Sequence, residues 1–131
     1  MEVKSTEIKF KRGVYAEYEI KNGILFSTLI NEIVIDMAAA EVIVRERLEL
    51  CDGKNYPSLF EFDKFKNADK NVRNYMNTEG LKGIKAGAIL TTSLMVKTFM
   101  NFYLSVYKPA IPSKVFSDRE KAITWLMQYT D

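Results

Sequence analysis

The sequence contains no histidine and a single cysteine, Cys51. Histidine is the commonest general base and the commonest transition-metal ligand, so its absence removes the most frequent routes to catalysis and to metal binding. One cysteine cannot form an internal disulfide, which is typical of a protein from a reducing compartment. We expect Cys51 to be a small core residue, and we expect no cofactor and no catalytic residue.

Long apolar runs are missing as well. Residues 1–13 lack the apolar segment of a signal peptide, and no run approaches the ~20 apolar residues that a membrane span requires. We therefore expect a cytoplasmic protein without a membrane span.

Charge of one sign is not concentrated anywhere in the chain. The net charge is +2, and the lysines alternate with glutamates and aspartates. Binding to nucleic-acid phosphates needs a concentrated positive surface, so we expect no nucleic-acid partner. Hydrophobic residues make up 47% and charged residues 27%, the balance of a globular protein. Without a linker or repeat, residues 1–131 are expected to form one domain.

The N-terminal part has the alternation of β-strands. Asn22 and Gly23 can supply the positive backbone angles of a tight hairpin turn. Apolar residues alternate along the strand before this turn, at Val14, Ala16, Tyr18 and Ile20. We predict an antiparallel meander with a turn at residues 11–13 and strands at residues 3–10, 14–20 and 24–30.

From residue 35 onward, helical and extended patterns alternate. Apolar residues recur at intervals of three and four on one helical face, at Met37, Ala40, Val44, Leu48 and Cys51. Four helices are predicted to begin near residues 35, 68, 93 and 117, with Asp36, Ser93 and Ser117 as caps for three of them. Strands are predicted at residues 56–62, 84–91 and 112–116. This order predicts an α/β fold with a partly parallel sheet and helices on at least one face.

Residues 85–109 are the most apolar part of the chain. Residues 84–91 are small or β-branched without alternation, as in a strand that is covered on both faces. The following helix carries apolar side chains around most of its circumference, at Leu94, Met95, Phe99, Phe102, Tyr103 and Val106. Lys108 and Pro109 should end this helix. We expect the segment to organise the core.

Three segments carry a resemblance to a known family: KNYPSLFEF, AGAILTTSLMVKTFMNFYLSVYKP and IPSKVFSDREKAITWL. From about residue 14 onward the chain resembles the small bacterial STAS-like (SpoIIAA-like) proteins, and in particular an uncharacterised branch of them. This is the fold of the anti-sigma-factor antagonists. The resemblance implies a mixed sheet with an antiparallel N-terminal meander, then alternating helices and strands with four helices, and a regulatory or protein-interaction role.

The regulatory members of that fold carry a phosphorylatable serine at the start of the helix that follows the strand corresponding to residues 56–62. In this chain the junction, residues 63–69, contains no serine or threonine. The resemblance therefore does not extend to a phosphorylation switch at this place.

Glu61 and Asp63 stand at the carboxyl end of a predicted strand, where ligands of open α/β sheets usually bind. Such a pair could hold Mg²⁺ or act as acid and base in a Mg²⁺-dependent enzyme. No third ligand is identifiable, so we favour a simpler interpretation. Glu61 is then a solvated strand residue, and Asp63 is a turn or cap residue.

Thr91, Thr92 and Ser93 lie between a predicted strand and its helix. Their hydroxyl groups and the free amides of the first helical turn could bind an anion or accept a phosphoryl group. Capping of the helix by Ser93 explains the same residues, and we favour it.

The third candidate is an aromatic run on the predicted helix after Ser93. Its residues could line a pocket for an apolar ligand or form a dimer surface, and they are Phe99, Phe102, Tyr103 and Tyr107. For Phe99 and Phe102 we favour ordinary core positions, whereas for Tyr103 and Tyr107 an interface is equally well supported.

The leading hypothesis from the sequence is a non-catalytic cytoplasmic protein-interaction or regulatory domain. Its protein partner is not specified by the sequence, and homodimerisation through an aromatic helix face fits the pattern. The alternative is a carrier or sensor of a small apolar or lipid-like ligand beside residues 94–107. A Mg²⁺-dependent enzyme that uses Glu61 and Asp63 is the third hypothesis.

Overall fold

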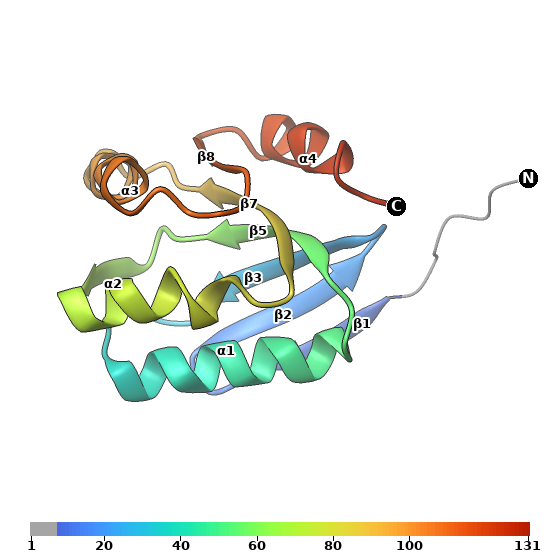
Figure 1. The fold of residues 1–131 in the computed structure, drawn as a ribbon, viewed down its shortest axis with the longest axis horizontal. Helices are drawn as coiled ribbons and strands as arrows, with labels where there is room; N and C mark the ends of the chain where they lie inside the picture. The colour runs from blue at the N-terminus through green and yellow to red at the C-terminus, as the bar shows by residue number, and fades with distance from the viewer. Residues whose placement is uncertain (1–7) are drawn as a thin grey trace, which may run out of the picture.

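The computed structural model describes residues 8–131, which form two sheets, four α-helices and one 3₁₀ turn (Figure 1). The strands are β1 (Lys9–Arg12), β2 (Ala16–Lys21), β3 (Ile24–Leu29), β4 (Ile33–Ile35), β5 (Tyr56–Glu61), β6 (Phe65–Ala68), β7 (Ile84–Leu90) and β8 (Ser113–Phe116). The helices are α1 (Met37–Cys51), α2 (Lys70–Met76), α3 (Leu94–Tyr107) and α4 (Arg119–Met127), with the 3₁₀ turn η1 at Glu79–Leu81. The predicted α/β order with four helices is confirmed.

The main sheet has six strands in the order β1-β2-β3-β5-β7-β8. The pairs β1–β2 and β2–β3 are antiparallel, and the pairs β3–β5, β5–β7 and β7–β8 are parallel. Asn22 and Gly23 join β2 to β3 with φ angles of 54° and 77°, as predicted for the hairpin turn. The sheet is therefore mixed, and its antiparallel meander consists of β1, β2 and β3.

Helices cover both faces of this sheet (Figure 1). On one face α1, α2 and the inner side of α3 bury the larger core, which includes Tyr18, Leu25 and Met100. On the other face α4 packs against β5 and β7, where Leu59 and Leu126 are buried. Burial of both faces explains why β7 carries small and β-branched residues without alternation.

Side-chain caps begin the helices as the sequence predicts, with one correction. Asp36 accepts a hydrogen bond from the Ala39 N–H at 2.8 Å, and Ser93 accepts one from the Val96 N–H at 3.2 Å. The predicted cap at Ser117 is wrong, because α4 begins one residue later and Asp118 is its cap.

Three further predictions about the strands need correction. Lys11 and Arg12 lie in β1 rather than in a turn, and the part of the predicted strand at residues 3–7 lies outside the described residues. Val14 is exposed because it lies in the connection before β2 and not in the strand. The short parallel pair β4–β6 was not predicted, since three or four residues are too few to show a strand period.

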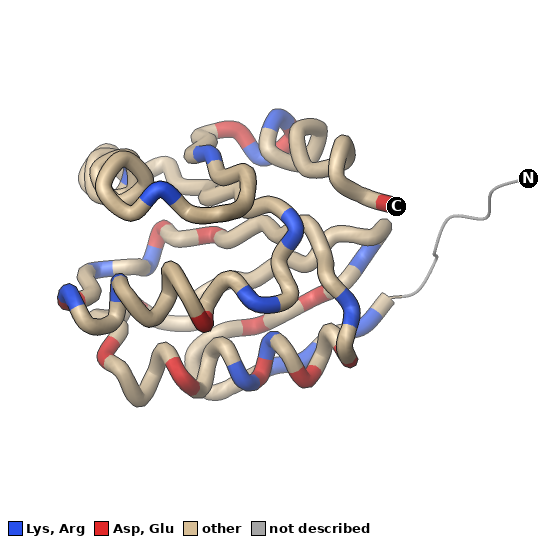
Figure 2. The backbone as a smooth tube through the Cα atoms, in the orientation of Figure 1, with Lys and Arg blue, Asp and Glu red and all other residues tan. Residues whose placement is uncertain are grey.

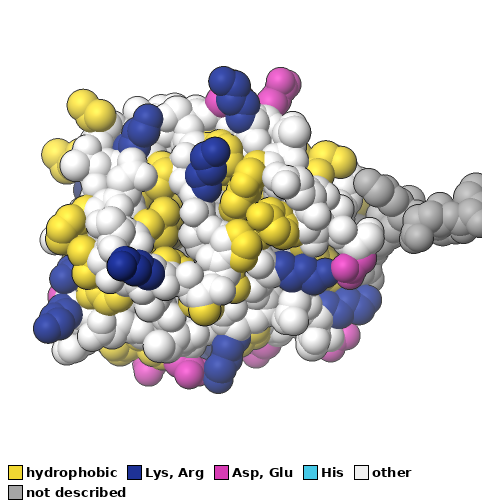
Figure 3. All heavy atoms as spheres, turned by 45° about the horizontal axis from the view of Figure 1, so that its top comes forward, with side chains coloured by type: hydrophobic (Ala, Val, Ile, Leu, Met, Phe, Trp, Pro, Cys, Tyr) yellow, Lys and Arg dark blue, Asp and Glu magenta, His cyan; other side chains and the backbone are white. Residues whose placement is uncertain are grey.

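The position of α3 differs most from the expectation. Only Val96 and Met100 of this helix are buried, and four of its apolar residues are exposed: Leu94, Met95, Phe102 and Val106. The core position that we favoured for Phe102 is wrong, since this side chain is 63% exposed. The helix contacts the sheet at the edge strand β8, so no element within residues 8–131 covers its outer side. Hydrophobic side chains accordingly gather over this end of the molecule (Figure 3).

Candidate functional site

The two polar candidates from the sequence meet at the carboxyl ends of β5 and β7. Asp63 Oδ1 accepts hydrogen bonds from the Thr91 hydroxyl and from the Thr92 N–H, each at 2.8 Å. Asp63 Oδ2 accepts a third from the Thr92 hydroxyl at 3.3 Å. The two strands are parallel neighbours, so the residues that follow them lie side by side.

These contacts place an internal anion at the N-terminus of α3. Burial alone would raise the pKa of Asp63, but the hydrogen bonds from Thr91, Thr92 and Ser93 outweigh it and lower the pKa. Asp63 is therefore ionised and occupies the hydrogen-bond donors that an external anion or phosphoryl group would use. The role of Thr91, Thr92 and Ser93 in binding an external anion stays a prediction.

Glu61 points to a different partner. Its carboxylate pairs with Arg119 of α4 at 2.9 Å, and the Arg119 guanidinium lies 5.4 Å from the centre of the Phe26 ring. Glu61 and Asp63 are thus each engaged by donors of the chain itself. Within residues 8–131, no group of three or more acidic or cysteine side chains is arranged to hold a metal ion.

The third candidate, the aromatic run of α3, lies beside a cavity. A space of about 110 Å³ lies between the inner side of α3, the sheet and α2. Phe99, Tyr103 and Leu104 line it from α3, and Phe60 and Ile89 line it from the sheet. Arg73, Ser113 and the Tyr103 hydroxyl supply its polar groups, and the other lining side chains are apolar.

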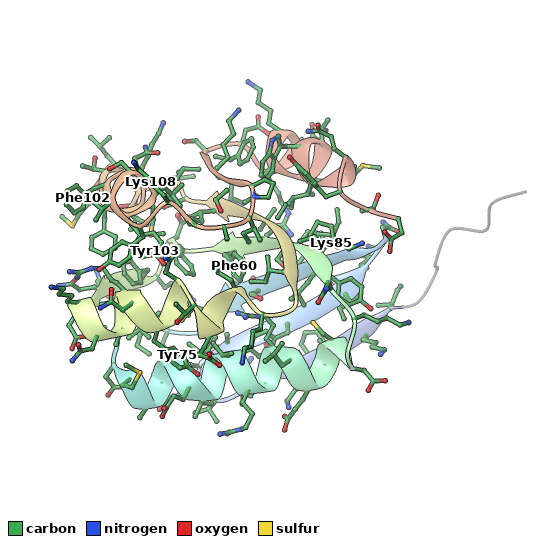
Figure 4. All side chains as sticks on the ribbon, in the orientation of Figure 1. Phe60, Tyr75, Lys85, Phe102, Tyr103 and Lys108 are labelled. Carbon is green, nitrogen blue, oxygen red and sulfur yellow. The ribbon has the colours of Figure 1, made fainter. Side chains whose placement is uncertain are left out.

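Two tyrosines hold α3 against α2 at one end of this cavity. The Tyr103 and Tyr107 rings stack with centres 4.8 Å apart. Tyr103 donates a hydrogen bond to the Arg73 carbonyl at 3.4 Å, and Tyr107 accepts one from Arg73 Nε at 3.4 Å. Burial, with a smaller contribution from Tyr107, raises the pKa of Tyr103 to about 12. Figure 4 shows Tyr103 between α3 and α2. Tyr107 lies outside the cavity lining.

A family described as "Domain of unknown function (DUF7793)" matches residues 18–130. The chain belongs to this family. Among solved structures, it is similar to an uncharacterized protein from the DUF3478 family with a SpoIIAA-like fold from Shewanella loihica PV-4. The TM-score is 0.59, with 13% identity over 96% of this chain and 97% of the other. No curated protein matches the chain.

At this identity the likeness establishes the fold of the DUF7793 chain, which is SpoIIAA-like, as the resemblance implied. It carries no residue roles from one protein to the other.

Figure 2 shows basic and acidic residues interspersed along the backbone, for example along α1. None of the helices within residues 8–131 is long and apolar enough to cross a bilayer.

Sequence reasoning missed two buried charged residues on α1 of the DUF7793 chain. Glu46 is 7% exposed and Arg47 is 1% exposed. Glu46 accepts hydrogen bonds from the Tyr18 hydroxyl at 3.0 Å and from the Val14 N–H at 3.1 Å. One signal was available for Arg47, which falls three residues after Val44 and so continues the apolar stripe of the helix.

Proposed function

We propose that this protein is a non-catalytic binding domain that holds a small apolar molecule in the cavity beneath α3. One observation carries the proposal, namely the cavity of about 110 Å³ with its apolar lining. An enclosed engineered cavity of about 150 Å³ lined by Leu, Ile and Phe stays dry and binds benzene. The space beneath α3 is partly open to the surface, but its mainly apolar walls likewise favour an apolar guest.

The structure of the helix supports a role in ligand binding. Val96 and Met100 anchor α3 to the core, while Phe99, Tyr103 and Leu104 face the cavity and are only partly buried. Side chains that still have exposed apolar area gain burial when an apolar molecule fills the space beside them. The binding energy would therefore come mainly from the inner side of α3.

The non-catalytic part of the proposal rests on the two carboxylates. Asp63 is held by Thr91 and Thr92, and Glu61 is held by Arg119. A general acid or base must be within hydrogen-bond reach of a substrate, and these groups already satisfy partners of their own chain.

A matched pair of substitutions on α3 tests the cavity. Leu104→Phe adds volume inside the cavity, whereas Val106→Phe adds a similar volume on the outer side, where Val106 is 55% exposed. Binding of 1-octanol or benzene to the whole chain is measured by NMR titration or thermal shift. We expect Leu104→Phe to abolish binding and Val106→Phe to leave it unchanged.

Native mass spectrometry of the protein from its own cells gives a second measurement of the same proposal. A bound apolar molecule is expected in the wild-type chain and not in Leu104→Phe. If neither probe binds and no molecule is recovered, the proposed function is wrong.

A second candidate function is protein binding or regulation through the outer face of α3. The observation that favours it is the exposure of Met95, Phe102 and Val106, which fall within a narrow arc of the helix. Phe102→Glu should weaken binding of a protein partner, or of a second copy of the chain, without loss of fold. Light scattering of the wild-type chain and of Phe102→Glu distinguishes self-association from a monomer that binds another protein.

A further inference from the structure

Arg47 is a buried cation whose hydrogen bonds are incomplete. Its Nη2 donates to the carbonyls of Gly80 at 2.7 Å and Lys82 at 3.3 Å, and its guanidinium lies 5.9 Å from the centre of the Phe60 ring. Its Nε and Nη1 have no hydrogen-bond partner among residues 8–131. Buried donors are nearly always paired, so these two groups call for an acceptor.

No carboxylate within residues 8–131 forms an ion pair with Arg47. The adjacent Glu46 is engaged by Tyr18 and Val14 instead. Burial lowers the pKa of Arg47, because the charged form loses its hydration. A buried charge without a counter-charge is costly, so an acceptor that also carries negative charge is favoured.

A second, smaller cavity has Arg47 in its wall. Its volume is about 30 Å³, and both Arg47 and Ser27 line it. Ser27 is 7% exposed, and its hydroxyl oxygen also has no partner in the part of the chain that the structure describes. Arg47 of α1 and Ser27 of β3, which both carry unpaired groups, therefore line one space that is large enough for a small polar group. The unpaired atoms themselves are covered, so these side chains must turn to present them to a group in that space.

The smaller cavity adjoins the apolar cavity beneath α3. Four residues line both spaces: Ile35, Phe60, Phe62 and Met76. The side chain of Met76 is unbranched and adopts many conformations, so among these four side chains it can move most readily. A single elongated molecule would reach both spaces only if Met76 or another side chain of this shared wall changed conformation.

We propose that the ligand of this protein is an apolar monocarboxylate, with its apolar body beneath α3 and its carboxylate at Arg47 and Ser27. This assignment rests on the proposed function. One carboxylate supplies one negative charge for one guanidinium, and its oxygens accept hydrogen bonds from the unpaired N–H groups of Arg47 and from the Ser27 hydroxyl. The ligand class therefore follows from the groups that the fold leaves unsatisfied.

Three probes measure separately how the negative charge and the apolar body of the ligand contribute to its affinity. Binding of octanoate, 1-octanol and acetate to the whole chain is measured by isothermal titration calorimetry or NMR at neutral pH. We expect octanoate to bind roughly tenfold or more tightly than 1-octanol, because hydrogen bonds to charged groups add that much affinity. Acetate alone should show no binding at the same concentrations.

Each contrary result has a distinct meaning. Equal affinity for octanoate and 1-octanol, or binding of 1-octanol alone, overturns the carboxylate assignment and leaves the proposed function intact. Binding of acetate as tight as that of octanoate also overturns it, because the site would then take a free small anion. Absence of binding by both octanoate and 1-octanol overturns the assignment together with the proposed function.

Substitutions locate the carboxylate. Ser27→Ala removes a hydroxyl that has no partner among the described residues, so the fold should persist while octanoate affinity falls by about threefold and 1-octanol affinity stays the same. Ser58→Ala is the matched control, because Ser58 is a buried serine of β5 that lines neither cavity. Arg47→Met should remove the preference for octanoate over 1-octanol. A preference that persists in both Ser27→Ala and a folded Arg47→Met overturns the assignment.

Discussion

Asp63 and Thr91 join the ends of two parallel strands through a 2.8 Å hydrogen bond between a carboxylate and a hydroxyl group. The contact connects residues that are 28 positions apart, and it brings together two candidate sites that the sequence had separated. Its physical effect is to hold the start of α3 against the end of β5. The chain thereby uses its own carboxylate where other proteins bind anions at a helix N-terminus.

The Asp63 contact should be visible in the pH dependence of stability. The pKa of Asp63 is lowered in the folded state, so its stabilisation is present above its unfolded pKa of about 3.9 and is lost as the pH falls through the folded value. Asp63→Ala should cost about 1 kcal/mol at neutral pH, a small value because the carboxylate is largely exposed. Urea denaturation at neutral and acid pH measures both effects. A cost that stays the same as the pH is lowered through the acid range would contradict the assignment.

Gly13 and Gly87 should respond in opposite ways to the same substitution. A Cβ at Gly13 would collide with the Glu46 carboxylate, which must then move away from Tyr18 and Val14. We expect Gly13→Ala to cost roughly 1–3 kcal/mol. A Cβ at Gly87 would meet its nearest neighbour, Phe60, at 3.8 Å, so Gly87→Ala should be neutral or stabilising by up to ~1 kcal/mol. Chemical denaturation of the two variants tests this difference, and equal effects would refute it.

Tyr103 should contribute to the loss of stability in alkali. Its pKa of about 12 in the folded state lies above the value of about 10 for an unfolded chain. The stabilisation is therefore complete below pH 10 and is lost as the pH rises from about 10 to about 12. Tyr103→Phe should show a smaller fall in the free energy of unfolding over that interval. Parallel curves for the wild-type chain and the variant would show that Tyr103 does not titrate as described.

Met100 and Phe102 are two residues apart on α3, but they should differ in their contributions to stability. Met100 is 5% exposed, so Met100→Ala is expected to cost roughly 2–5 kcal/mol. Phe102 is 63% exposed, so Phe102→Ala should change stability by no more than about 0.5 kcal/mol. Thermal unfolding of the two variants measures the contrast. A large loss in Phe102→Ala would mean that another surface covers this side chain in solution.

Local signals predicted the parts of the fold that depend on a few adjacent residues. The turn at Asn22 and Gly23 requires positive φ angles, and the caps at Asp36 and Ser93 require a side-chain acceptor near free amides. These requirements are met within three or four residues of the chain. Such features can be predicted without knowledge of the tertiary structure.

The remaining features depend on which elements become neighbours. The exposure of Phe102 follows from the place of α3 at the β8 edge, and an apolar pattern around most of a helix does not indicate which side will be covered. Likewise, the contact of Asp63 with Thr91 requires β5 and β7 to be adjacent. The hydrogen bonds that Arg47 does form go to the carbonyls of Gly80 and Lys82, more than thirty positions away. A local sequence pattern therefore cannot show which of its N–H groups will be left unpaired.

The basic residues that the structure places in β1 rather than in a turn affect how copies of the chain meet. Within residues 8–131, β1 is an edge of the six-stranded sheet, and Lys11 and Arg12 carry positive charge along it. Lys11 pairs with Glu49 and Arg12 with Glu17. Edge-to-edge pairing at β1 would have to remove water from these charged side chains, which opposes extension of the sheet from one molecule into the next. We therefore expect this edge to disfavour sheet-to-sheet aggregation.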